Sequence, residues 1–139
     1  MQAGDIILLE GPFGAGKTVF VQGLAEGMGI RDGVSSPSFV LVNEYHNRLT
    51  LYHADLYRVQ GVEEAEALGL EEYLSGRGVF VAEWPEQVAE VWPGEHLWMK
   101  FSIAGRRERV ISARARGSRY VRILEAFAES RAGRGRVKT

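Results

Sequence analysis

The chain has 139 residues, of which 45% are hydrophobic and 25% charged, and it contains no cysteine. This length and composition predict one globular domain, and the missing cysteines exclude disulfides, thiolate metal sites and cysteine nucleophiles. No apolar run reaches the roughly 20 residues that a membrane span needs. The N-terminus shows no signal-peptide pattern, so we expect a cytoplasmic protein without membrane contact.

Charge is divided unevenly along the chain, although the net charge is only −1. Residues 1–99 contain 5 Lys/Arg and 15 Asp/Glu, whereas residues 100–139 contain 12 and 3. Such a division indicates either pairing between the two parts or a basic surface for a polyanion or an acidic partner. We expect residues 1–130 to form the domain and residues 131–139 to form a basic, flexible tail.

The most informative segment reads Gly-Pro-Phe-Gly-Ala-Gly-Lys-Thr, from Gly11 to Thr18, and matches the pattern G-x-x-x-x-G-K-[ST]. An apolar run at 5–10 precedes it, and apolar residues at helical spacing follow it through 18–28. In a strand–loop–helix of this kind the loop amides surround phosphates, Lys17 reaches the terminal phosphates, and the Thr18 hydroxyl ligates Mg²⁺. The segment therefore predicts a nucleoside triphosphate site.

The rest of the chain alternates between strand and helix patterns. Further strands are expected at 39–45, 49–55, 78–83, 96–104 and 108–115, with the first two and the last two each forming a hairpin. Helices are expected at 61–74 (one or two short ones), from Pro85 to 91, and at 118–130. In the last of these, Ser118 is a candidate cap, and one face is formed by Val121, Leu124 and Phe127. The predicted fold is α/β: a P-loop nucleotide-binding core with a central parallel sheet flanked by antiparallel strands and hairpins.

A triphosphatase also needs an acidic group near the metal and a group that positions the attacking water. Glu83 ends the buried run at 79–83 and is the candidate metal ligand; the alternative is an ordinary acid at a strand end. Asp55 ends another strand and either ligates Mg²⁺ through water, orients the nucleophile, or caps a turn or helix. His53 is interpreted as a packed or hydrogen-bonded structural histidine rather than a catalytic group.

Two further positions have open alternatives. Trp84 follows Glu83 and either packs or contacts the nucleotide. Ser38 lies in the loop at 35–38, where hydroxyls contact the γ-phosphate or its metal, or form local turn hydrogen bonds.

Together these segments resemble the bacterial tRNA threonylcarbamoyladenosine biosynthesis ATPase family TsaE, also called YjeE. The run Leu-Tyr-His-Ala-Asp-Leu-Tyr-Arg at 51–58 is far more distinctive than the phosphate loop. The other matching stretches are 4–5, 11–18, 36–45 and 83–85, so the resemblance covers residues 4–90 and is weak beyond 95.

The resemblance implies a Mg²⁺-dependent protein that binds ATP and slowly hydrolyses it to ADP. It implies an accessory role with the TsaB–TsaD assembly, which modifies adenosine 37 of tRNAs that read codons beginning with A. By position, Lys17, Asp55, Glu83, Ser38 and Trp84 would be the catalytic set, with Thr18 and Glu83 as metal ligands. The nucleotide would contact Phe13, Gly14, Ala15, Gly16, Lys17, Thr18 and Val19.

The chain departs from that family in three ways. Val19 and Ser38 stand where many members have Thr. Many members also have a helical segment before the first strand, whereas this sequence begins almost at the strand, so weaker contacts to adenine are expected.

Three other functions compete with this reading. A small P-loop metabolite kinase would need an arginine-rich lid and an acceptor pocket, and neither is recognisable between Lys17 and Glu83. A GTPase would need an Asn-Lys-x-Asp segment, which the sequence does not contain. An RNA-binding module built on the basic C-terminal part, with weak or indirect tRNA contact, is the third; we favour charge pairing or protein docking there.

Overall fold

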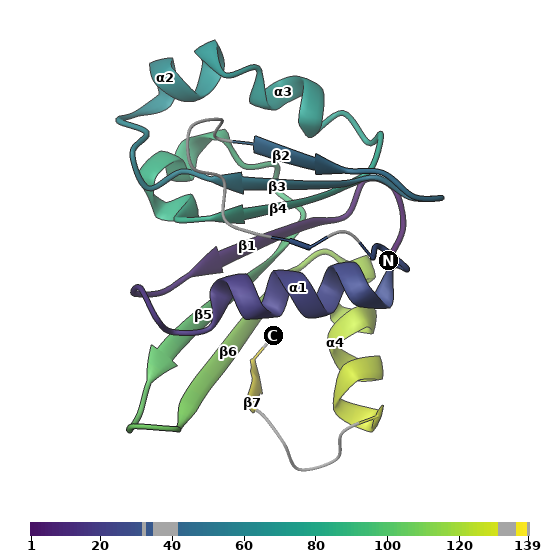
Figure 1. Cartoon of the computed structure of the whole chain (residues 1–139), viewed down its shortest axis with the longest axis vertical. Coiled ribbons are helices and arrows are strands. Elements are labelled where there is room, and N and C mark those ends of the chain that lie inside the picture. The colour runs from purple at the N-terminus through teal and green to yellow at the C-terminus, as the bar shows by residue number, and fades with distance from the viewer. Residues whose placement is uncertain (32, 35–41, 131–135, 139) are drawn as a thin grey trace.

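The computed structural model describes residues 1–31, 33–34, 42–130 and 136–138. Its centre is a seven-stranded sheet in the order β2-β3-β4-β1-β5-β6-β7 (Figure 1). The strands are β1 (Ile6–Glu10), β2 (Val42–Tyr45), β3 (Leu51–Asp55), β4 (Val79–Glu83), β5 (His96–Ile103), β6 (Arg109–Arg116) and β7 (Arg136–Lys138). The helices are α1 (Lys17–Gly27), α2 (Val62–Ala67), α3 (Leu70–Tyr73), the 3₁₀ segment η1 (Pro85–Val91) and α4 (Ser118–Ser130).

The four central strands, β3, β4, β1 and β5, are parallel, while β2 and β6 pair antiparallel at either side of them. This arrangement confirms the predicted parallel core with flanking hairpins. Strands β1 and β4 read as uninterrupted apolar runs because they are covered on both faces. Their carboxyl ends meet at one edge of the sheet, which is where open α/β sheets bind ligands.

Alternation along the strands divides the core into two layers. Odd-numbered residues of β1 and β4, such as Ile7 and Val81, pack beneath α1 and α4. Even-numbered residues, such as Leu8 and Phe80, pack against α2, α3 and η1 on the opposite face (Figure 1). Strands β1 and β4, which lead to the candidate site, are therefore packed on both faces.

Helix α4 is fixed to the beginning of β1. The Arg119 guanidinium donates from Nε and Nη2 to the two oxygens of Asp5, at 3.1 and 2.9 Å, and this carboxylate is only 2% exposed. The Tyr120 hydroxyl accepts the amide of Ile6 at 2.9 Å. Part of the charge division seen in the sequence is thus internal pairing between the acidic and basic parts.

Three sequence expectations need refinement. Residues 85–91 form a 3₁₀ segment, interrupted at Val88 (φ −139°, ψ 50°), whose side chain is fully buried. Helix α4 begins at Ser118 itself, and the amides of Tyr120 and Val121 donate to the carbonyl of Gly117, so Gly117 takes the position expected for Ser118. Its buried side chains are Tyr120 and Leu124, whereas the expected Phe127 is 52% exposed.

The described residues include no helix long and apolar enough to cross a membrane. Of the expected tail, residues 131–135 and 139 lie outside the described part, and residues 136–138 form β7 beside β6.

Candidate nucleotide-binding site

The phosphate loop connects the end of β1 to the first residue of α1. Gly14 and Gly16 have φ values of +79° and +103°, in the left-handed region that favours glycine. Gly11 is required for another reason, because a Cβ there would lie 2.6 Å from the carbonyl oxygen of Phe101 on β5. The loop is thus shaped by close packing against β5 and opens onto the N-terminus of α1, where an anion is favoured.

Lys17 is folded into this loop rather than extended into solvent. Its side chain is only 4% exposed, and its ammonium group donates a hydrogen bond to the carbonyl of Gly11. Burial lowers the pKa of Lys17, while the nearby carboxylates of Glu83, Glu86 and Asp55 act in the opposite direction. A desolvated cation of this kind interacts strongly with an incoming phosphate.

Glu83 lies directly opposite the start of α1. Its Oε2 accepts a hydrogen bond from the Thr18 hydroxyl at 3.3 Å, so the two predicted metal ligands are neighbours in space although 65 residues separate them. The same oxygen is 2.6 Å from Nε2 of His53, which is fully buried on β3. Among the described residues, His53 Nδ1 has no hydrogen-bond partner.

Asp55 is next to Glu83 because β3 and β4 pair in parallel with these two residues in register. Its Oδ1 accepts a hydrogen bond from the amide of Tyr57 at 3.0 Å, which is the local turn contact named among the alternatives for Asp55. Burial raises the pKa of Asp55, the Tyr57 amide lowers it, and the charge of Glu83 raises it further. The carboxyl is therefore both a turn cap and a member of the acidic pair beside the loop.

Trp84 is the only described residue other than glycine with a positive φ, at +62°. This conformation places its ring over Lys17, with the ammonium nitrogen 3.8 Å from the ring centroid. Phe13 and Tyr57 contact the same ring, at centroid distances of 5.1 and 4.9 Å. Phe13 and Trp84 thus face the cation in a cation–π arrangement, and Tyr57 packs against both of these rings.

Comparison with known proteins identifies the family. A family model described as Threonylcarbamoyl adenosine biosynthesis protein TsaE matches residues 1–111. The chain belongs to the TsaE family. The Bacillus subtilis (strain 168) protein named tRNA threonylcarbamoyladenosine biosynthesis protein TsaE is 46% identical over 123 residues, which cover 88% of this chain and 77% of that protein.

Other similarities agree with this membership. The Treponema pallidum (strain Nichols) protein of the same name is 46% identical over 93 residues, covering 67% of this chain and 69% of its own length. A crystal structure of Bacillus subtilis YdiB superposes with a TM-score of 0.75 at 37% identity, covering 94% of this chain and 80% of that one. The resemblance to TsaE that the sequence motifs indicated is confirmed, and so is the α/β fold class.

Most of the residues that the TsaE resemblance singled out lie around one point. Lys17, Thr18, Glu83, Asp55 and Trp84 come from the loop, from α1 and from the ends of β3 and β4. Of the loop positions, Ala15 is buried, whereas Phe13 and Val19 are 64% and 68% exposed and are accessible to a ligand. Ser38 lies outside the described residues.

The residues present fit a magnesium nucleotide. A hydroxyl and a carboxylate are oxygen ligands of the type that Mg²⁺ prefers, and Mg²⁺ usually takes its remaining ligands from substrate phosphates and water. The described residues contain no group of three or more His, Asp or Glu side chains that could hold a metal by themselves. Thr18 and Glu83 would hold the ion only together with phosphate.

The expectation that His53 is a packed or hydrogen-bonded structural histidine is confirmed, although its partner Glu83 was not predicted. Sequence reasoning missed two contributors to this TsaE-family site. Tyr57 packs against Phe13 and Trp84, the two rings that lie over Lys17. Arg109, on β6, donates to the carbonyl of Gly14 from Nε and Nη2 at 3.3 and 3.2 Å, a contact that no local pattern predicts.

Proposed function

We propose that the chain binds ATP with Mg²⁺ and hydrolyses it slowly to ADP and phosphate. In this proposal it acts as an accessory factor on a TsaB–TsaD assembly, for threonylcarbamoylation of adenosine 37 in tRNAs that read codons beginning with A. It is not itself the transferase. The single observation that supports ATP chemistry most strongly is the juxtaposition of Lys17 and Thr18 with Glu83 across the loop.

Each side chain has a role that follows from its position. Lys17 would exchange its hydrogen bond with Gly11 for the β- and γ-phosphates, since a charged acceptor is preferred over a carbonyl. Thr18 and Glu83 would hold Mg²⁺, which when bound neutralises phosphate charge. His53 would fix the orientation of the Glu83 carboxylate through its 2.6 Å contact.

Asp55 is the candidate for orienting the attacking water. Burial, and after it the charge of Glu83, raise the pKa of Asp55, so this carboxylate is a stronger base than an ordinary Asp. Trp84 would keep water away from Lys17 until the nucleotide enters. Slow turnover is consistent with the contacts of Arg109, the arginine that bonds to the loop among the described residues, because its guanidinium donates to backbone carbonyls.

Involvement in tRNA modification is supported by membership in the TsaE family, whose members carry this function in their names. The docking of a TsaB–TsaD assembly is an extension of that membership.

The test separates binding, hydrolysis and modification. ATP and GTP affinities are measured by calorimetry, phosphate release is followed with and without TsaB–TsaD, and tRNA modification is scored in the reconstituted mixture. Lys17→Ala should abolish nucleotide binding, and Glu83→Ala should spare most binding but remove Mg²⁺-dependent hydrolysis. Arg77→Ala, an exposed basic residue just before β4 and thus at the opposite edge of the sheet, is the matched control.

Unchanged turnover in Lys17→Ala or Glu83→Ala would contradict the assigned roles. Transfer of the γ-phosphate to a small acceptor, in place of release, would favour a kinase. Modification that proceeds equally without this chain would refute the accessory role while leaving the ATPase intact.

A further inference from the structure

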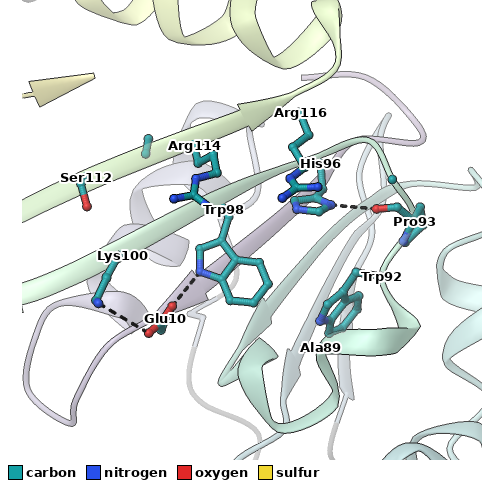
Figure 2. A pocket seen from close by; sticks show the side chains of 12 residues that line it. Glu10, Ala89, Trp92, Pro93, His96, Trp98, Lys100, Ser112, Arg114 and Arg116 are labelled. Atoms are coloured by element: carbon teal, nitrogen blue, oxygen red, sulfur yellow. Dashed lines mark hydrogen bonds and ion pairs between the residues drawn. The ribbon is translucent and has the colours of Figure 1, made fainter. Parts of the chain in front are cut away.

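A second concave surface lies on the face of the sheet opposite α1 and α4. It has a volume of about 570 Å³ and runs along β5 and β6, with the end of η1 forming one wall (Figure 2). We call it the basic groove, lined principally by His96, Trp98, Lys100, Ser112, Arg114 and Arg116. The nucleotide site uses none of these six side chains.

Strand register explains why these side chains share one surface. His96 pairs with Arg116, Trp98 with Arg114, and Lys100 with Ser112, so three cross-strand pairs follow one another along the groove. Pairs two residues apart point to the same face of a sheet. The intervening pairs, such as Met99 with Ala113, belong to the core beneath α1 and α4.

The groove is positively charged and its cations are available. Arg114 and Arg116 are exposed, and neither forms an ion pair with another described residue. Lys100 is 61% exposed, and its contact with Glu10 is long, at 4.0 Å. Such an exposed pair is weak, so it does not remove Lys100 from interaction with an anion. The basic groove thus contains three cationic side chains and one carboxylate, that of Glu10. Its positive charge is local, because the net charge of the whole chain is −1.

The centre of the groove also presents a flat aromatic surface. The Trp98 indole on β5 donates to Glu10 Oε1 at the end of β1 at 2.8 Å, which fixes the orientation of the ring (Figure 2). The ring is only partly buried, and His96 lies beside it at a centroid distance of 6.0 Å. A positively charged groove with a positioned aromatic ring is the combination by which proteins hold single-stranded nucleic acid.

We propose that the basic groove binds an unpaired segment of RNA, with its phosphates on Arg114, Arg116 and Lys100 and a base against Trp98. Side chains two residues apart on a strand are spaced by about 7 Å, so Arg114 and Arg116 can contact successive phosphates of an extended chain. Planar guanidinium groups suit phosphate oxygens especially well.

An acidic peptide is the competing occupant. Strand addition, a frequent way of binding an extended peptide, is blocked alongside Ser112 and Arg114 because β7 pairs with β6 there, while β5 is enclosed by β1 and β6. The groove's accessible aromatic surface is Trp98 with His96 beside it, since Trp92 is only 9% exposed, and this surface is not a series of apolar pockets for alternate side chains. These features favour RNA.

The test is independent of ATP hydrolysis because it is done without nucleotide. A fluorescein-labelled RNA hairpin with an unpaired seven-nucleotide loop is titrated with the full chain, and anisotropy is read at several salt concentrations. The variant is Arg114→Gln with Arg116→Gln, and Trp98→Leu tests the ring. The matched control is Arg106→Gln with Arg107→Gln, which removes the same charge from the exposed turn between β5 and β6.

The groove variant should lose at least about tenfold in affinity, and its salt dependence should flatten by about 1.4 in log–log slope, since each phosphate contact to a single strand contributes about 0.7. Trp98→Leu should weaken binding with little change in slope, and the control should stay within about threefold of the parent chain. Circular dichroism and thermal melting check that each variant is folded.

Equal losses in the groove variant and the control would overturn the proposal, because binding would then follow net charge alone. Absence of binding by the parent chain at moderate salt would overturn it as well. Displacement of the RNA by a glutamate-rich peptide at similar concentration would assign the groove to a protein partner instead. Loss of ATP hydrolysis in other variants would leave the RNA result unaffected.

Discussion

Trp84 combines an unfavourable backbone with a ring that covers the phosphate-binding lysine. At φ +62° and ψ +47° it adopts the left-handed conformation, which costs an L-residue about 1–2 kcal/mol relative to the right-handed one. Glycine avoids this cost because it has no Cβ. We therefore expect the sequence at position 84 to be selected for the ring rather than for stability.

A pair of variants separates the two effects. Trp84→Ala and Trp84→Gly both remove the ring and its contacts with Lys17, Phe13 and Tyr57. Only Trp84→Gly also removes the energetic cost of the left-handed backbone conformation. The greater conformational entropy of glycine in the unfolded chain offsets about 0.5–1 kcal/mol of this stabilisation. The Gly variant should thus be more stable than the Ala variant by about 0.5–1 kcal/mol.

The assay is urea unfolding of both variants, followed by far-ultraviolet circular dichroism, together with ATP hydrolysis. Hydrolysis should fall in both by a similar factor, roughly tenfold, if the ring contributes about 1–2 kcal/mol to holding Lys17. An Ala variant as stable as the Gly variant would refute the backbone argument. Full hydrolysis in either variant would refute the role of the ring.

Three other changes test the surrounding contacts. His53→Leu should lower the free energy of unfolding by about 1.5–3 kcal/mol, because Glu83 loses a buried charge-assisted hydrogen bond, and His53→Gln should lose less; chemical denaturation measures both. Asp5→Ala should lower the free energy of unfolding by a similar amount, about 1.5–3 kcal/mol, because the two hydrogen bonds from Arg119 are lost. A double-mutant cycle with Arg119→Ala measures the interaction energy of this pair. A value near zero would show that α4 is held by packing alone. Because burial lowers the pKa of Lys17 below its ordinary 10.5, the folded chain releases this proton first, so unfolding free energy should rise with pH between the lowered value and 10.5. Lys17→Met should remove that rise from the stability–pH curve, and an unchanged curve would show that Lys17 is not desolvated.

The elements of this fold are local properties of the sequence, which is why most of them could be predicted. The apolar run of β1, the glycines after it and the periodic residues of α1 each act within about ten positions. The meeting of Thr18 with Glu83 was also predictable, because the carboxyl ends of neighbouring parallel strands share one edge. Where the outcome depended on what packs over an element, prediction was less accurate: Val88 interrupts η1, and α4 buries Tyr120 rather than Phe127.

The contacts that were missed depend on strand order and register. His53 reaches Glu83 only because β3 lies directly beside β4, with Asp55 opposite Glu83 and His53 two positions before it on the same face. Nothing within the run 51–58 reveals that neighbour. Arg109 reaches Gly14 because β5 lies beside β1 and β6 returns antiparallel along β5. Sequence patterns predict elements, whereas these contacts follow from the order of strands in the sheet.

The same alternation keeps the two surfaces of the molecule apart while joining them through one strand. Leu9 belongs to the core beneath α1, whereas Glu10, the last residue of β1, turns to the basic groove and accepts the indole proton of Trp98. Gly11, the next residue, begins the phosphate loop. A change in the loop that moves Glu10 must therefore also move the ring at the centre of the groove, although the two sites share no ligand-binding side chain. Because Glu10 and Gly11 are adjacent, we expect nucleotide in the phosphate loop and RNA in the basic groove to change each other's affinity.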